Sequence, residues 1–301
     1  MRARQRAFFE LHLAVFLYGF TAILGDLIQL SATVLVWWRV LLTSLSLWIL
    51  IGFGRRLRGI PARLWRAYAG IGVLIAIHWI TFFASVKYAN ASVALVCFAT
   101  CSFFTSILEP LIMRTPFAWH ELLVGALVIP GMWLVVQGID VTMWTGVWLG
   151  LFSTVVIALF SVLNKRLIHD LDTPTLTFIE MSSAWLFISC GLPFFLHQNP
   201  SWVFWPVGID WFYLAILALV CTTFALVLNL RALKELSAFT TSLTYNLEPV
   251  YGILLAVFLL NENRELGGAF YAGVGLILAS VFGYPFFKKW RNKHKHVLNR
   301  N

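Results

Sequence analysis

The chain has 301 residues, of which 60% are hydrophobic and 12% are charged, and its mean hydropathy is +0.83. Soluble domains carry about 45–50% apolar and about 25% charged residues, so this composition excludes an ordinary soluble enzyme, a disordered protein and a disulfide-stapled secreted domain. The net charge of +9 would suit nucleic-acid binding in a soluble protein. In a membrane protein the same charge belongs to the basic loops that orient the helices.

Apolar stretches long enough to cross a bilayer, which takes ~20 residues per helix, fill almost the whole chain. The first of them carries Glu10 and His12 and is followed by nine more, which argues against a cleavable signal peptide. The sequence therefore predicts an all-α integral membrane protein with ten transmembrane helices, at about residues 7–28, 33–54, 67–86, 91–113, 118–138, 146–164, 174–196, 209–230, 236–260 and 266–287.

The basic residues are distributed unevenly between the two sides of this predicted bundle. If the N-terminus is cytoplasmic, all but three of the 22 lysines and arginines fall in inner segments. The exceptions are Lys87 and Arg264 on the outer side and Arg39 within the second stretch. Positively charged loops stay on the cytoplasmic side, so we expect a bacterial inner-membrane protein with both termini in the cytoplasm.

The second half of the chain resembles the first. The segment Ala84–Ala91 matches Arg231–Ala238, which aligns Lys87 with Lys234. The segment Ser102–Pro110 matches Thr241–Pro249 in a different register, which aligns Glu109 with Glu248. Each half holds five stretches, an odd number, so the halves are expected to be inverted repeats, residues 1–140 and 141–301 with a basic tail. Inverted repeats are typical of secondary transporters, whose substrate site lies near the midplane.

Several short motifs make the chain resemble the EamA family of the drug/metabolite transporter superfamily. They are Leu17–Phe20 with Gly25, Trp38-Arg39, Leu236–Thr240, Leu247–Ala256, Leu260–Glu262 and Gly273–Leu278. The first half departs from the family pattern, with Ser102-Phe103 where a proline is usual and Arg114-Thr115 where Gly-Glu is usual. The resemblance implies a ten-helix transporter of small metabolites that works by alternating access.

Ionisable residues within a bilayer are functional candidates by default, because their burial in lipid is costly. Glu248 lies near the middle of its stretch, and Thr241, Thr244 and Tyr245 are expected on the same helical face, just before Pro249. Glu248 is predicted to contact substrate or carry a proton, and the alternative is a structural carboxyl bonded to a neighbouring helix.

Three further charged residues are predicted to act with Glu248 in coupling or gating, namely Arg39, Glu109 and Glu180. Each has a structural alternative. Arg39 could extend its side chain to the membrane interface as an anchor, and Glu109 lies close to the cytoplasmic end of its stretch. Glu180 could lie in a gate or in a helix–helix hydrogen bond.

The remaining substrate-binding candidates are polar or aromatic residues placed deep in the stretches. His78 could titrate near neutrality or simply bond a neighbouring helix, and the deep aromatic residues could line a cavity or pack. The pair Gly146 and Gly150 has the spacing of a close helix contact, within the bundle or in a homodimer. The complete predicted substrate-binding set is Tyr18, His78, Trp79, Phe82, Phe160, Asn164, Asn229, Tyr245 and Glu248.

These features predict a secondary transporter, most consistent with an exporter, that moves a small organic metabolite through the lipid bilayer. The sequence contains no nucleotide-binding loop, so ATP is not the direct energy source; proton coupling through Glu248 or His78 and uncoupled exchange both stay open. The alternatives are a membrane enzyme or a channel. His120-Glu121 lacks the second histidine of a zinc motif, and neither a catalytic residue, a metal, a cofactor nor a nucleic-acid partner is predicted.

Overall fold

A computed structural model describes residues 2–137 and 140–259, together with isolated positions between 268 and 279. The described chain consists of helices and their connections. The predicted tenth helix at 266–287, Arg264 and the basic tail lie largely or wholly outside these residues. Within the described part, seven helical stretches are long and apolar enough to cross a membrane. The chain is therefore a multi-pass helical membrane protein.

The first half begins with three long helices and continues with two interrupted ones. The fourth predicted helix is divided at Ala99–Thr100 and the fifth at Leu127. In chain order the elements are α1 (Arg2–Leu27), α2 (Ala32–Leu50), the short η1 (Arg55–Leu57), α3 (Ala62–Tyr88), α4 (Ala91–Phe98), α5 (Cys101–Met113), α6 (Trp119–Ala126) and α7 (Val128–Gln137).

The second half follows a similar order. After two long helices comes a continuous helical stretch whose middle, η3, is π-helical: the hydroxyls of Thr222 and Thr223 donate to carbonyls five residues earlier. A divided helix follows it. The elements are η2 (Val141–Met143), α8 (Trp144–Leu167), α9 (Thr173–Gln198), α10 (Asp210–Ala215), η3 (Ile216–Phe224), α11 (Ala225–Glu235), α12 (Ala238–Tyr245) and α13 (Glu248–Leu259).

The two divided helices α4–α5 and α12–α13 correspond residue for residue. Asn90 caps the N-terminus of α4 by accepting from the Val93 N–H at 2.8 Å, and Ser237 caps α12 by accepting from the Thr240 N–H at 3.1 Å. The starts, breaks and restarts of these helices all follow the register that aligns Lys87 with Lys234. The structure thus supports that register. The other register, which aligns Glu109 with Glu248, is wrong.

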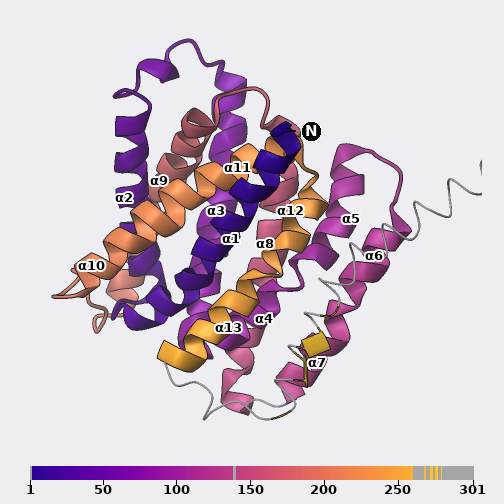
Figure 1. Cartoon of the computed structure of the whole chain (residues 1–301). Coiled ribbons are helices and arrows are strands. Elements are labelled where there is room, and N and C mark those ends of the chain that lie inside the picture. The colour runs from indigo at the N-terminus through magenta and orange to yellow at the C-terminus, as the bar shows by residue number, and fades with distance from the viewer. Residues whose placement is uncertain are drawn as a thin grey trace, which may run out of the picture.

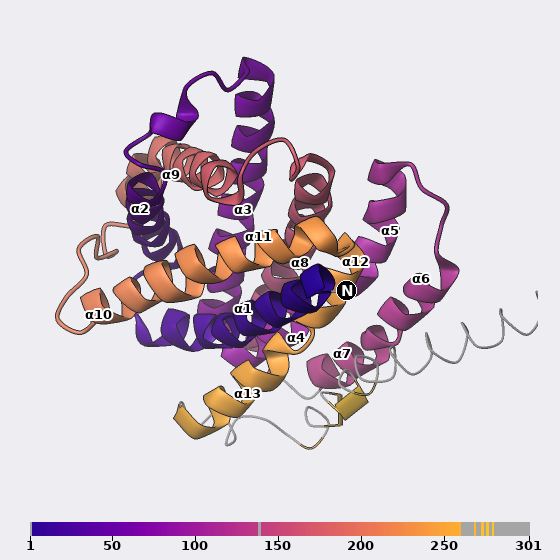
Figure 2. The same cartoon turned by 45° about the horizontal axis from the view of Figure 1, so that its top comes forward.

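The helices form a bundle in which α3 is central and packs against both α8 and α9 (Figure 1). Helices α1 and α11 lie side by side in both views (Figure 2), and α2 packs against both α9 and η3. Helix α12 packs on α5, and α13 packs on α4 and α1, so the divided helices of the two halves meet. Two side-chain hydrogen bonds join them, from Asn246 to Ser102 and from Thr105 to Ser242.

Small residues allow close helix contacts inside the bundle. A Cβ atom added to Gly146 would lie 2.6 Å from the Cβ of Ala89, and one added to Gly150 would lie 2.8 Å from the Ser85 hydroxyl. The glycine pair therefore serves a contact within the chain, where α8 meets the end of α3. The predicted homodimer gains no support from this motif and stays a prediction.

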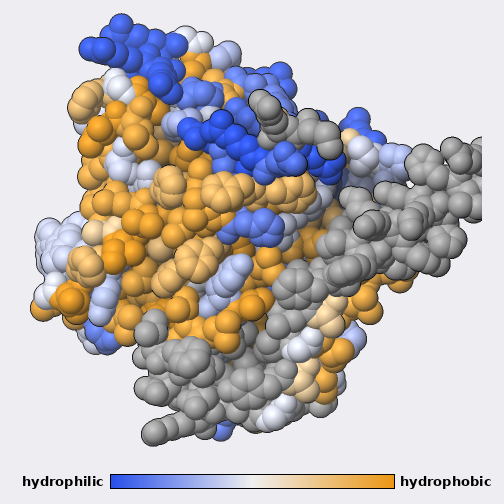
Figure 3. All heavy atoms as spheres, in the orientation of Figure 1, coloured by the Kyte–Doolittle hydropathy of each residue, from blue (hydrophilic) through white to orange (hydrophobic). Residues whose placement is uncertain are grey.

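The outer surface carries the polarity pattern of a membrane protein. Hydrophilic residues gather at the end that holds the N-terminus and η1, and hydrophobic residues cover the surface below them (Figure 3). Large apolar side chains such as Trp48, Leu111, Trp148 and Phe194 are exposed. Lipid is the environment in which such a surface is stable.

Candidate functional site

A cavity of about 50 Å³ lies in the middle of the bundle, between the two halves of the chain. Helices α1 to α4 contribute one side, and α8, η3, α11, α12 and α13 contribute the other. The structure brings together nine residues that the sequence singled out: Tyr18, Arg39, His78, Trp79, Phe82, Phe160, Asn229, Tyr245 and Glu248.

Arg39 is the only arginine of α2 and points into the bundle, with 1% of its surface exposed. Its Nε donates to the Thr222 hydroxyl at 2.7 Å, and its guanidinium carbon lies 4.0 Å from the centre of the Trp79 ring. The Nη1 group has no hydrogen-bond partner. The interface-anchor interpretation of Arg39 is thus wrong for this conformation, because the cation is held at the cavity by η3 and α3.

Glu248 is the first residue of α13 and reaches the cavity directly after the break in the ninth predicted helix. It is 4% exposed. The ion pairs of the described residues lie elsewhere, so Arg39 and Glu248 face one cavity without neutralising each other at contact distance. The buried cation and the buried carboxyl group are therefore both available to bind a solute in the cavity.

The polar face expected around Glu248 is interrupted by that break. The hydroxyls of Thr241 and Thr244 donate to carbonyls of their own segment, and only Tyr245 joins Glu248 at the cavity. Pro249 is the second residue of α13, where its missing N–H costs no helical hydrogen bond. The helix is interrupted before the proline, at Asn246–Leu247, and α13 begins after this break.

Tyr245 and Asn229 form a bonded pair on the second-half side. The Asn229 amide donates to the Tyr245 hydroxyl at 2.7 Å, and that hydroxyl donates to the Asn229 carbonyl oxygen at 3.0 Å. The Tyr245 ring lies edge-on to Tyr18 of α1, at 6.3 Å between centres. This aromatic contact links the two halves across the cavity.

His78 also lines the cavity but is held by α8. The Ser153 hydroxyl donates to the His78 carbonyl at 2.8 Å, and its oxygen lies 2.7 Å from His78 Nδ1. Nδ1 also lies 3.0 Å from the Ser153 main-chain carbonyl oxygen, which can only accept, so Nδ1 carries the hydrogen of these contacts. The geometry favours the interhelical hydrogen-bond partner that the sequence left as one alternative.

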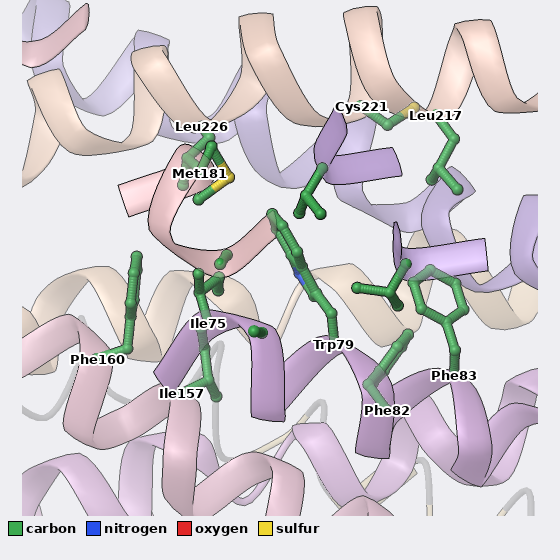
Figure 4. Packing of buried hydrophobic residues seen from close by; sticks show 14 of the residues in the cluster. Ile75, Trp79, Phe82, Phe83, Ile157, Phe160, Met181, Leu217, Cys221 and Leu226 are labelled. Carbon is green, nitrogen blue, oxygen red and sulfur yellow. The ribbon is translucent and has the colours of Figure 1, made fainter. Parts of the chain in front are cut away.

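Aromatic and aliphatic side chains make up the rest of the wall. The Trp79 ring stands between α3 and the helix that carries Leu217, Cys221 and Leu226, with Phe160 to one side (Figure 4). The sequence reasoning did not single out seven of the lining residues. They are Thr21, Ile75, Phe98, Ile157, Cys221, Thr222 and Leu226. The repeat could have indicated Phe98, which ends α4 as Tyr245 ends α12.

Three predicted residues lie outside the cavity. The carboxylate of Glu109 accepts the backbone N–H groups of Ala238 at 3.1 Å and Phe239 at 2.6 Å, so it caps α12 from the other half. Glu180 and Asn164 are fully buried next to each other, where α8 and α9 pack on α3. The structure therefore separates these groups from the wall that holds Glu248.

A sequence model of the EamA-like transporter family matches residues 7–137 and 144–284, nearly all of both halves. The chain belongs to this family. A crystal structure of another protein is similar over 93% of this chain and 95% of its own, with a TM-score of 0.67 and 18% identity, and it supports the fold alone. No curated protein matches the chain. Membership of a transporter family makes the cavity between the halves a candidate solute site.

Proposed function

We propose that this EamA-family protein is a secondary transporter that exports a small organic metabolite across the bacterial cytoplasmic membrane by alternating access. The observation that carries the proposal is the cavity between the halves, where Arg39 and Glu248 are buried without pairing to each other. Buried charges without a partner are expensive. A solute that contacts them in one state of the cycle offsets that cost.

The arrangement of the described helices supports two inverted halves with a cytoplasmic N-terminus, and the proposal adds a tenth membrane segment at 266–287 and a cytoplasmic C-terminus from the sequence. Helix α1 runs away from the hydrophilic end of the molecule, whereas its counterpart α8 runs toward it (Figures 1 and 3). Basic residues at this end include Arg55, Arg114 and Arg166. That distribution fits a cytoplasmic end.

Polar contacts hold the helix ends on both the outer and the inner side of the bundle. On the outer side, Lys87 donates to the carbonyls of Asp26 and Ile28, at the C-terminal end of α1. On the inner side, its counterpart Lys234 donates to the carbonyl of Leu171, just after α8 ends. Glu109 adds an inner contact between the halves through its bonds to α12. The lysine contacts hold elements of one half together, whereas the Glu109 contacts join the two halves and must break when the inner side opens.

The size of the cavity indicates that this conformation is closed. A volume of about 50 Å³ holds only a few waters, at ~10–15 Å³ each on the same measure. A metabolite therefore enters only when the helices separate on one face. Such an opening is the step that alternating access requires.

The lining residues define the solute that fits best. The free Nη1 of Arg39 donates to an anionic or carbonyl group, and Glu248 accepts from an ammonium or hydroxyl group. Trp79, Phe82 and Phe160 contact an apolar or aromatic body. Proton coupling and uncoupled exchange are both compatible with this wall.

Transport by purified protein tests the proposal. Proteoliposomes are loaded with a panel of radiolabelled amino acids, organic acids and nucleosides, and release is measured with and without a pH gradient. We expect one class to be released, and we expect the rate to fall at least tenfold in Arg39→Lys, because an ammonium cannot replace the planar guanidinium at this site. Glu235→Gln, an exposed position at the end of α11, is the matched control.

Two outcomes would contradict the proposal. Equal release from protein-containing and empty vesicles across the panel would remove the transport function. Large unitary currents across a planar bilayer would instead indicate a channel.

A further inference from the structure

A second polar cluster lies at the junction of α3, α8 and α9, apart from the central cavity. Glu180 of α9 is 0% exposed, and neither of its carboxyl oxygens has a hydrogen-bond partner. Asn164 of α8 is equally buried beside it, and its two amide atoms are also unpartnered. Ser161, one turn earlier on α8, has an unpartnered hydroxyl. These three residues do not line the solute cavity.

The helices around Glu180 bring no cation to it. From α3 comes Tyr68, whose hydroxyl is occupied in donating to the Leu167 carbonyl at 2.7 Å. Arg39 of α2 is bound to Thr222 at the cavity. At the inner ends of α8 and α11, Lys165 and Lys234 donate to backbone carbonyls. The backbones of α3 and α9 are in such close contact at Gly72 that a Cβ there would overlap the Glu180 carbonyl.

An ionised carboxylate in this setting would be a bare charge in the interior of a lipid-embedded bundle. Such a group neutralises instead, by taking a proton or a cation. A protonated carboxyl has one O–H to donate, and the polar group beside it is the Asn164 side-chain amide, which offers a carbonyl acceptor as well as N–H donors. With one added proton the carboxyl and the amide can exchange two hydrogen bonds, whereas an ionised Glu180 can only accept from the Asn164 N–H and leaves the Asn164 carbonyl oxygen without a donor.

We propose that Glu180, with Asn164, is a proton-binding site separate from the solute cavity, and that it couples solute movement to proton movement. This inference rests on the proposed transport function. In the closed conformation the Glu180 carboxyl holds the proton. The proton comes from water and binds a carboxyl oxygen, and it returns to water when the inner side opens.

The position of the cluster suits this role. Asn164 lies in the last turn of α8 and Glu180 in the second turn of α9, so both are near the inner end, where Lys234 and Glu109 make their contacts. Ser161 lies beside Tyr245, which belongs to the cavity wall. Separation of the inner contacts would hydrate Glu180 while the cavity opens, and protonation and solute access would change together.

Infrared spectroscopy of the full-length protein in lipid vesicles at pH 7 tests the site without any solute. We expect C=O absorption of protonated carboxyls that shifts in D₂O and includes a band that Glu180→Gln removes and that Glu248→Gln, at the other buried carboxyl, and the control Glu235→Gln both keep. In Asn164→Leu the band should move to higher frequency, because the carboxyl loses its acceptor. A wild-type spectrum that Glu180→Gln leaves unchanged would overturn the proposal. Loss of the band when sodium chloride replaces choline chloride at constant pH would also overturn it, in favour of a metal cation.

Coupling is tested in proteoliposomes with the member of the radiolabelled panel that wild type releases. Glu180→Gln should still exchange labelled for unlabelled solute at a rate within about twofold of wild type, and it should lose the acceleration by a pH gradient. Unchanged acceleration would overturn the coupling role. Failure of wild type to move any panel member would count against the transport function alone, because the infrared band does not depend on transport.

Discussion

At the scale of single residues, Gly72 shows how closely the bundle is packed around α3. Alanine at this position would place its Cβ against the Glu180 carbonyl, whereas a Cβ at Gly70, two residues earlier in the same helix, would meet nothing within 4 Å. We expect Gly72→Ala to destabilise the protein by about 1–3 kcal/mol, which is typical of overpacking. Thermal unfolding in detergent should show a lower midpoint.

Gly70→Ala is the matched control for this prediction. The exposed helical position should tolerate alanine or gain up to about 1 kcal/mol, because glycine is a poor helix former. Equal melting temperatures for the two variants would show that α3 and α9 have room to separate at Gly72.

Most residues of the cavity wall could be predicted from sequence, because they are polar or aromatic residues deep within apolar stretches. Polar or aromatic residues in the middle of an apolar stretch, such as Glu248 and Trp79, have few stable places other than the interior of the bundle. The same reasoning placed Asn164 in the substrate site and Glu180 in a coupling or gating role, although neither lines the cavity and both are buried where α8 and α9 pack on α3. Position along a helix gives depth in the membrane, but the side that a residue faces depends on which helices become neighbours.

At the scale of elements, the breaks in the two divided helices could not be located from proline or glycine. Pro110 and Pro193 lie inside continuous helices, whereas the breaks fall at Ala99–Thr100 and Asn246–Leu247. Hydrogen bonds between the halves, from Asn246 to Ser102 and from Thr105 to Ser242, lie close to the breaks. Such contacts are tertiary, so a local pattern does not reveal them.

The start of α12 depends on a residue of the other half. Glu109 accepts two of its backbone N–H groups, and a carboxylate at a helix N-terminus also interacts favourably with the helix dipole. We expect Glu109→Ala to cost about 1–2 kcal/mol of stability, as the loss of a helix cap does. Glu109→Gln should cost less, because its amide oxygen still accepts one bond. Thermal unfolding of both variants in detergent measures the difference, and equal losses would contradict the capping role.

At the scale of the whole molecule, the predicted orientation has a direct test by cysteine labelling. In a Cys190→Ser background, an impermeant maleimide should label Ser201→Cys in intact cells. Thr115→Cys and His169→Cys should be labelled only after permeabilisation. All three positions are exposed, and they lie after α9, α5 and α8. The labelling rates should differ at least tenfold, because the bilayer bars the reagent from the cytoplasmic loops. Rapid labelling of Thr115→Cys in intact cells would contradict the orientation.

The pairing of Lys87 with Lys234 has an energetic consequence for the transport cycle. Each lysine ends the third helix of its half and donates to carbonyls at or just after the C-terminal end of the first helix. The bonds are of the same kind on both faces, and their number differs little, two from Lys87 on the outer face and one from Lys234 on the inner face. When the inward-open and outward-open states differ little in the free energy of these contacts, the binding of one solute molecule is enough to favour release on one side over the other.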